Sequence, residues 1–174
     1  HCDWSSDVCS SDLHSLTLTA PLRLRKISTK KFAVEGTPTD CVMMAMNQVM
    51  ADNPPDLLLS GVNRGANMGE DVTYSGTIAA AMEGTLVGVP SIALSQSFAN
   101  RKVMHWPTAE QHASDIIRRL AAIGWSRDVL MNVNFPDCLP GDVKGVEVVR
   151  QGRRDLSALH IEQRIDDRDR KSVG

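Results

Sequence analysis

The sequence has few aromatic residues, no long apolar run and no surplus of basic side chains, and each of these absences excludes a class of protein. Aromatic residues make up 4% of the 174 residues, so aliphatic and methionine side chains must fill the core. No apolar run approaches the ~18 residues of a membrane-spanning helix, and we therefore expect no membrane partner. The formal net charge is −2 with no basic stripe, which argues against a domain that binds nucleic acid. A hydrophobic content of 42% over this length is typical of one globular domain.

The cysteines form no metal-binding pattern. No two of the four cysteines are spaced as C-x-x-C, the arrangement that is typical of a structural zinc site. Cys41 and Cys138 stand far apart from each other and from the remaining cysteines. We therefore expect both to be reduced thiols of an ordinary cytoplasmic protein rather than parts of a disulfide framework.

The most informative part of the sequence is the stretch 56–77. Three leucines at 57–59, preceded by a proline pair, predict a short buried strand. Glycines then recur at every fourth position as far as Gly69, with an asparagine between each pair, which predicts a loop. The alanine-rich residues 77–86 follow and predict a helix. The stretch therefore combines a strand end, a glycine- and asparagine-rich loop and a helix start.

This layout suits the binding of a phosphate group. Ligands of open α/β sheets bind outside the carboxyl ends of the strands. The N-terminus of a helix adds free backbone N–H groups and the positive end of the helix dipole. Hydroxyl groups at the helix start donate further hydrogen bonds. An asparagine amide offers either its oxygen to Mg²⁺ or Mn²⁺ or its NH₂ group to a phosphate oxygen.

A helix-packing face is the main alternative for Gly61, Gly65 and Gly69. Three glycines in a soluble helix would each cost roughly 1 kcal/mol, and the preceding strand makes a loop the better interpretation. The pattern also differs from the dinucleotide fingerprint G-x-G-x-x-G. It is not a P-loop either, because no Gly-Lys-Ser/Thr follows.

The rest of the chain alternates between expected strands and helices, which favours a parallel sheet with right-handed crossovers. We expect Thr39 to cap the first helix, with Asp40 in a structural role in its first turn, and Thr108 to cap the last helix. His105 lies in an irregular loop that could contact a nucleotide, although a solvated surface loop is the simpler interpretation. The expected strands are 16–24, 31–34, 91–95, 129–135 and 143–149, of which the first two suggest a small antiparallel excursion.

Several motifs together resemble the SurE family, the survival-protein-E 5′/3′-nucleotidases, which are metal-dependent phosphatases. The resemblance runs from His14 to Arg168. It implies an α/β fold of three αβα layers, with a Rossmann-like, mostly parallel sheet and a small antiparallel β excursion, of which this chain carries an incomplete copy. The motifs are His14–Thr19, Gly36–Val42, Ser60–Gly69, Tyr74–Thr77, Ala79–Gly84 and Asn132–Pro136.

Both ends of the chain resemble translated sequencing-adapter sequence. We therefore expect residues 1–13 and 169–174 to be non-native segments around a SurE-like phosphatase-domain fragment over residues 14–168. Members of the family begin with a strand that ends in Asn-Asp-Asp-Gly, whose two aspartates bind the metal, and this sequence has no such strand. A serine ligand of the family falls by register on Ser10, inside the adapter-like segment, and we treat that match as chance.

The resemblance implies a divalent-metal-dependent phosphomonoesterase that hydrolyses nucleoside 5′- and 3′-monophosphates to nucleoside and phosphate. In this interpretation Asn63 binds Mg²⁺ or Mn²⁺, while neither the nucleophile nor the general acid is assigned. We expect this fragment to be inactive because the aspartate pair is missing. The implied phosphate-binding residues are Asn67, Ser75, Gly76 and Thr77.

The second interpretation is a non-catalytic α/β module that binds a nucleotide or phosphate at the same helix N-terminus without hydrolysing it. One asparagine does not hold Mg²⁺ firmly, because such sites normally need carboxylates. The resemblance further implies a cytoplasmic protein that is a homodimer or homotetramer when it is full length.

Overall fold

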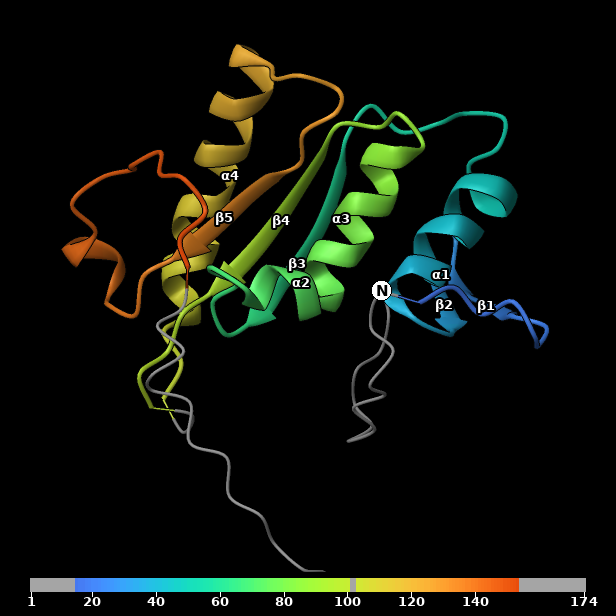
Figure 1. The fold of residues 1–174 in the computed structure, drawn as a ribbon, viewed down its shortest axis with the longest axis horizontal. Coiled ribbons are helices and arrows are strands. Elements are labelled where there is room, and N and C mark those ends of the chain that lie inside the picture. The colour runs from blue at the N-terminus through green and yellow to red at the C-terminus, as the bar shows by residue number, and fades with distance from the viewer. Residues whose placement is uncertain (1–14, 101–102, 154–174) are drawn as a thin grey trace, which may run out of the picture.

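The computed structural model describes residues 15–100 and 103–153, whose arrangement is shown in Figure 1. The main sheet has the strand order β3-β4-β5, and both of its strand pairs are parallel. Its strands are β3 (Leu58–Arg64), β4 (Ser91–Gln96) and β5 (Met131–Phe135). The predicted α/β class with a parallel sheet is confirmed.

Two helices cover opposite faces of this sheet, α3 (Gly76–Leu86) and α4 (Trp106–Ile123). Successive side chains of a strand point to opposite faces, and β4 is buried along its whole length. Its Ile92 and Leu94 pack in one cluster with residues of α4, whereas its Ala93 packs with residues of α3. The small alanines of α3 let it lie close to the sheet. The result is the three-layer αβα arrangement that the sequence predicted.

A small antiparallel sheet lies apart from the main one, as predicted. It pairs β1 (Arg23–Ser28) with β2 (Lys31–Glu35). The first strand begins at Arg23 and so later than expected, because residues 16–22 do not pair with a neighbouring strand. Next come α1 (Pro38–Met44) and η1 (Ala45–Val49), a single π-helical turn. Helix α1 contacts α3 on one side and β2 on the other. The hairpin is therefore separated from the main sheet by α1 and α3 (Figure 1).

The start of α1 corrects the predicted cap. Thr37 is the N-cap residue and forms a capping box with Asp40, whereas Thr39 is buried in the first turn. Asp40 is fully buried, and its carboxylate accepts hydrogen bonds from the Thr17 backbone and hydroxyl and from the Thr37 backbone. Burial on its own raises the pKa of Asp40, but these hydrogen bonds outweigh it and hold the pKa below its ordinary value. The structural role predicted for Asp40 is confirmed.

β3 is longer than predicted. The expected strand ended at Leu59, yet β3 continues to Arg64, so Asn63 lies in the strand rather than in a loop. The pairing of β3 with β4 shifts register between Ser60 and Asn63. Gly61 has a φ of 120°, and a Cβ there would meet the backbone carbonyl oxygen of Leu94. This glycine therefore serves the close approach of two strands, which the loop interpretation did not foresee.

Three further expectations differ from the structure. α4 begins at Trp106 with His105 at the N-cap position, so Thr108 is not the cap; its hydroxyl donates instead to the Cys138 carbonyl. Residues 143–149 form no strand; three of their four valines are exposed, and the segment has no neighbouring strand among the described residues. Two short helical turns were not predicted, α2 (Asp71–Tyr74) and η2 (Pro140–Asp142).

The two isolated cysteines differ from each other. Cys138 is a free thiol, as predicted. Cys41 is disulfide-bonded, so the prediction of a reduced thiol is wrong there, since sequence spacing does not show which cysteines the fold brings together. Among the described helices, none combines the length and the apolar character that crossing a bilayer requires.

Candidate functional site

A hollow of about 300 Å³ lies where β3 ends, beside the start of α3. This is the edge of a parallel sheet at which α/β proteins bind ligands. Four of the five residues predicted for the site meet there. Thr77, the fifth, is the next residue of α3 but is not part of the lining. The lining consists of Asn63, Ala66, Asn67, Asp71, Tyr74, Ser75 and Gly76.

The start of α3 forms one side of this hollow. Ser75 is the N-cap residue, and its Oγ accepts a hydrogen bond of 3.2 Å from the Ile78 backbone. The backbone N–H groups of Gly76 and Thr77 lie in the first turn, where a helix has no acceptor of its own to offer them. α3 is 11 residues long, so its dipole adds positive potential at this end. This end of α3 therefore has the donors that a phosphate group needs.

Asn67 is held in the hollow by hydrogen bonds from two strands of the sheet. It is 5% exposed, and its side-chain Nδ2 donates to the Ser95 Oγ at 2.8 Å. Its backbone N–H donates to the Asn134 Oδ1 at 2.8 Å. Its backbone carbonyl accepts from the Asn132 Nδ2 at 2.8 Å and from the Asn134 Nδ2 at 3.2 Å. The segment after β3 is thereby fixed to β4 and β5, although residues 65–67 have no regular secondary structure.

Ser95, Asn132 and Asn134 contact Asn67 in the structure, although no sequence pattern assigns them to the site. A signal was present, because two asparagines with one residue between them end a predicted strand and must share one of its faces. What the sequence did not show is that this face meets Asn67, some 65 residues earlier in the chain. Gln151 adds a further contact from the C-terminal side, donating to the Gly69 carbonyl at 2.9 Å.

Asn63 turns its side-chain nitrogen toward its own loop. Its Nδ2 donates to the Gly65 carbonyl at 2.8 Å, which leaves the amide oxygen as the atom with which it could bind a cation. Among the described residues that line the hollow, only Asp71 carries a carboxylate. Within residues 15–100 and 103–153, no three His, Cys, Asp or Glu side chains come together in a way that could hold a metal ion.

These donors do not by themselves fit Mg²⁺ or Mn²⁺. Mg²⁺ requires octahedral coordination by oxygen and is normally held by at least one or two carboxylates together with water and phosphate oxygens. The described residues that line the hollow offer neutral amide and hydroxyl oxygens but a single carboxylate, that of Asp71. Any complete metal site would need ligands from outside the described residues. Ser10, the position on which a serine ligand of the family falls by register, also lies outside them.

His105 has a partner outside the hollow. Its Nδ1 lies 2.7 Å from the Asp137 Oδ1, and the Ala99 backbone donates to the other carboxylate oxygen at 2.6 Å. The hydrogen bond from His105 and the one from Ala99 hold the pKa of Asp137 below its ordinary value. The pair ties the start of α4 to the segments that follow β4 and β5. His105 is not among the residues that line the hollow.

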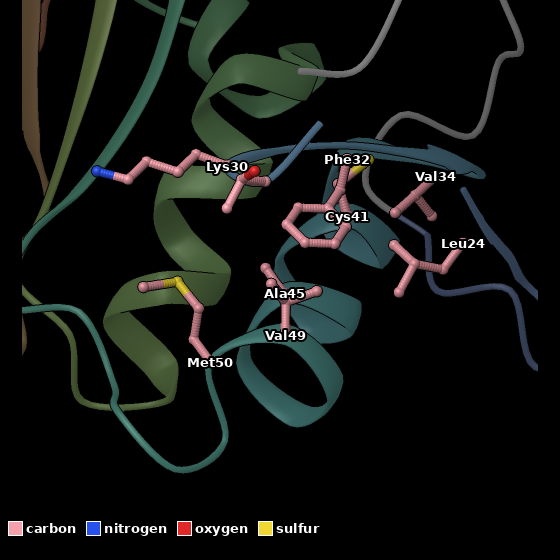
Figure 2. A pocket seen from close by; sticks show the side chains of 9 residues that line it. Leu24, Lys30, Phe32, Val34, Cys41, Ala45, Val49 and Met50 are labelled. Atoms are coloured by element: carbon pink, nitrogen blue, oxygen red, sulfur yellow. The ribbon is translucent and has the colours of Figure 1, made fainter. Parts of the chain in front are cut away.

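A second, larger hollow of about 440 Å³ lies between the β1–β2 hairpin and α1 (Figure 2). Its walls are mostly apolar, with Phe32, Cys41 and Val49 among them. Lys30 is the charged residue among the described residues that line it, and its side chain extends away from the apolar side chains in Figure 2. It lacks the converging amide and hydroxyl donors of the first hollow, so we place the candidate site beside α3.

Comparison with known proteins gives consistent matches. The chain is 56% identical over 164 residues to "5'-nucleotidase SurE" of Parvibaculum lavamentivorans, which covers 93% of this chain and 59% of the relative. It is 58% identical over 143 residues to the protein of the same name from Paramagnetospirillum magneticum, which covers 82% of this chain and 55% of the relative. The chain thus spans less than two thirds of the length of these curated relatives.

The fold gives the same result. The crystal structure of the SurE protein from Aquifex aeolicus superposes with a TM-score of 0.76 at 43% identity, covering 81% of this chain and 56% of that one. A sequence model of the family described as "Survival protein SurE" matches residues 7–158. This match begins inside the segment 1–13; the boundaries predicted at His14 and Arg168 lie outside the described residues and stay a prediction. Since the family match and the relatives each cover most of the chain, it belongs to the SurE family.

Proposed function

We propose that the protein is a phosphomonoesterase that hydrolyses nucleoside 5′-monophosphates, and 3′-monophosphates as well, to nucleoside and phosphate. The observation that carries the proposal is the hollow at the end of β3, where the first turn of α3 and the fixed amide of Asn67 converge. The names of the similar proteins support 5′-nucleotidase activity.

In this proposal the chain's own residues bind and orient the phosphate. The N–H groups of Gly76 and Thr77 and the hydroxyl of Ser75 surround the phosphate oxygens, and Asn67 donates from the opposite wall. Fixed donors of this kind stabilise the negative charge that develops on the phosphoryl oxygens and need no reorganisation during the reaction. We assign neither the nucleophile nor the general acid to any of the described residues.

We also propose that hydrolysis depends on a divalent metal, Mg²⁺ or Mn²⁺, with the Asn63 oxygen as one ligand. A metal would supply charge to the phosphoryl oxygens, which the neutral amides do not. Because the described residues do not complete such a site, we propose that the 174-residue chain taken alone hydrolyses nucleotides slowly or not at all.

The test is phosphate release from a panel of nucleoside 5′- and 3′-monophosphates by the protein expressed from its complete gene. The expected result is release that needs Mg²⁺ or Mn²⁺, stops in excess chelator and returns when metal is added. Release that persists in excess chelator would refute the metal requirement. No release from any nucleotide, by protein that melts cooperatively and has metal present, would refute the nucleotidase.

One observation favours a second candidate, a module that binds a nucleotide or phosphate without hydrolysing it. The groups that we propose to bind phosphate lie around one hollow, whereas the carboxylates that normally hold a catalytic metal are not gathered among the described residues. This module would show saturable phosphate binding with no release of phosphate from nucleotides at any metal concentration. Comparing binding with turnover on one protein sample separates the two candidates.

We propose a cytoplasmic enzyme that assembles as a homodimer or homotetramer and has no nucleic-acid or membrane partner, in line with the near-neutral charge of the chain. Cell fractionation and light scattering on the purified protein test these points. A monomer at micromolar concentration would contradict the proposed assembly.

A further inference from the structure

We propose that Ser95, together with Asn134, positions Asn67 for its contact with the substrate phosphate. Neither Ser95 nor Asn134 lines the hollow, so neither would touch the phosphate itself. Their role would be to fix a residue that does. This inference rests on the phosphate site proposed above and assigns the part of the sheet that holds it in shape.

The side chain of Asn67 is restrained by a buried neighbour. An asparagine carboxamide presents oxygen on one side and NH₂ on the other, and rotation about its last torsion exchanges them at little intrinsic cost. The Ser95 Oγ accepts a hydrogen bond of 2.8 Å from Asn67 Nδ2, and this bond is buried. Ser95 itself is fully buried. This bond restrains rotation about that torsion, because the carboxamide must keep a polar group directed at the Ser95 hydroxyl.

The backbone of Asn67 is fixed from the same place in the sheet. Ser95 of β4 and Asn134 of β5 are directly paired in the parallel register. The Asn134 carboxamide accepts from the Asn67 N–H at 2.8 Å and donates to the Asn67 carbonyl at 3.2 Å. One pair of neighbouring residues in the sheet thus fixes both the side chain and the main chain of Asn67.

The consequence is that loss of the Ser95 hydroxyl acts on phosphate binding through Asn67. Without its acceptor, the Asn67 amide is free to rotate, and a nearly buried NH₂ group is left without its partner. Removing one partner of a buried hydrogen bond costs more free energy than the bond itself contributes, because the remaining polar group stays buried without a partner. We expect the affinity for phosphate to fall about ten-fold, as for other losses of one well-placed hydrogen bond.

Ser91 offers a matched control. It lies on the same strand and the same face as Ser95, and it is also fully buried. Its hydroxyl makes a hydrogen bond of 2.9 Å to the Val89 carbonyl, at the end of β4 away from the hollow. Ser91→Ala and Ser95→Ala therefore delete the same buried group from one strand, and only the second deletion reaches Asn67.

The experiment measures the dissociation constant of inorganic phosphate by calorimetry for the protein expressed from its complete gene, with melting temperatures recorded for each variant. We expect Ser95→Ala to weaken binding about ten-fold and Ser91→Ala to change it less than about two-fold, with similar losses of melting temperature. In the double variant Ser95→Ala/Asn67→Ala, binding is expected to match that of Asn67→Ala alone, because both changes act through one side chain.

Equal effects of the two serine variants on phosphate binding, or additive effects in the double variant, would overturn the inference. Should Ser95→Ala fail to fold, Ser95→Cys carries the same expectation, because its sulfur fills the space but is a weak acceptor. A wild-type protein that binds phosphate but releases none from nucleotides would overturn the proposed nucleotidase and leave this inference standing. A wild-type protein that binds no phosphate would overturn both.

Discussion

The carboxamide of Asn134 contacts both backbone groups of Asn67. Its Oδ1 accepts from the Asn67 N–H at 2.8 Å, and its Nδ2 donates to the Asn67 carbonyl at 3.2 Å. Asn132 donates to the same carbonyl at 2.8 Å. The two asparagines are therefore not equivalent, because the carbonyl has two side-chain donors whereas the N–H bonds to Asn134.

We expect Asn134→Ala to reduce nucleotide turnover more than Asn132→Ala. The first change removes the acceptor of the Asn67 N–H and one donor, while the second removes one donor and leaves the other in place. A loss of about ten-fold in kcat/KM for Asn134→Ala and of less than about three-fold for Asn132→Ala is consistent with the usual worth of such bonds. Steady-state kinetics on both variants tests this, and an equal or reversed order would contradict the described network.

Ser75→Ala is expected to affect both stability and phosphate binding. It removes the N-cap of α3, which is worth about 1 kcal/mol, and it removes a hydroxyl from the lining of the hollow. Thr85→Ala is a suitable control, since Thr85 lies near the other end of α3 and donates to the Ala81 carbonyl. Denaturant unfolding and phosphate titration distinguish the two effects. A phosphate affinity that is unchanged in Ser75→Ala would remove Ser75 from the site.

Asp40→Asn is expected to destabilise the protein by about 3 kcal/mol at pH 7. The carboxylate accepts hydrogen bonds from Thr17 and Thr37. In Asp40→Asn an NH₂ donor replaces one of the two acceptor oxygens, and it would face these donors in a fully buried position. The exposed Asp52 supplies the control variant Asp52→Asn, for which we expect a change below about 0.5 kcal/mol. Unfolding by urea at pH 7 measures both.

The stability provided by Asp40 also depends on pH in a definite direction. Because the pKa of Asp40 is lowered in the folded protein, its contribution is complete above the ordinary carboxyl pKa of about 3.9 and is lost as the pH falls through the folded pKa. The wild type is therefore expected to lose more stability on acidification below about pH 4 than Asp40→Asn does. Parallel pH profiles for the two proteins would show that Asp40 is not the responsible carboxyl.

Gly61→Ala is expected to destabilise the main sheet by roughly 3 kcal/mol. Its φ of 120° is unfavourable for a residue with a side chain, and the added Cβ would meet the Leu94 carbonyl. Gly141→Ala serves as the comparison, because a Cβ at Gly141 has nothing within 4 Å. Thermal melts of the two variants decide this prediction. A small and similar effect at both positions would show that β3 and β4 do not approach as closely as described.

Much of the fold follows from local signals in the sequence. The short apolar run at 91–95 and the alanine-rich segment at 77–86 predicted β4 and α3 almost to the residue. The predicted strand ends at Leu59, because the glycines and asparagines that follow are typical of loops. In the structure β3 continues to Arg64, because the close approach of β4 requires a glycine inside the strand. The segment at 143–149 is rich in valine, as a strand would be, but it has no partner strand among the described residues.

The site was predictable where its residues are neighbours in the sequence. Ser75 and Gly76 indicate a helix start, and Asn67 precedes Ser75 by eight residues in the same glycine-rich stretch. Ser95 and Asn134 reach the site only because parallel strands bring distant segments to one edge of the sheet. Their contacts depend on register and on which face each side chain takes, and a single sequence without structure does not fix either.

The position of bound phosphate tests the central claim most directly. A crystal structure of the protein grown with inorganic phosphate and Mg²⁺ would locate the anion. We predict phosphate oxygens within hydrogen-bond distance of the Gly76 and Thr77 backbone N–H groups and of the Asn67 side chain. Phosphate bound elsewhere, with this hollow filled by water alone, would contradict the claim that the end of β3 and the start of α3 form the substrate site.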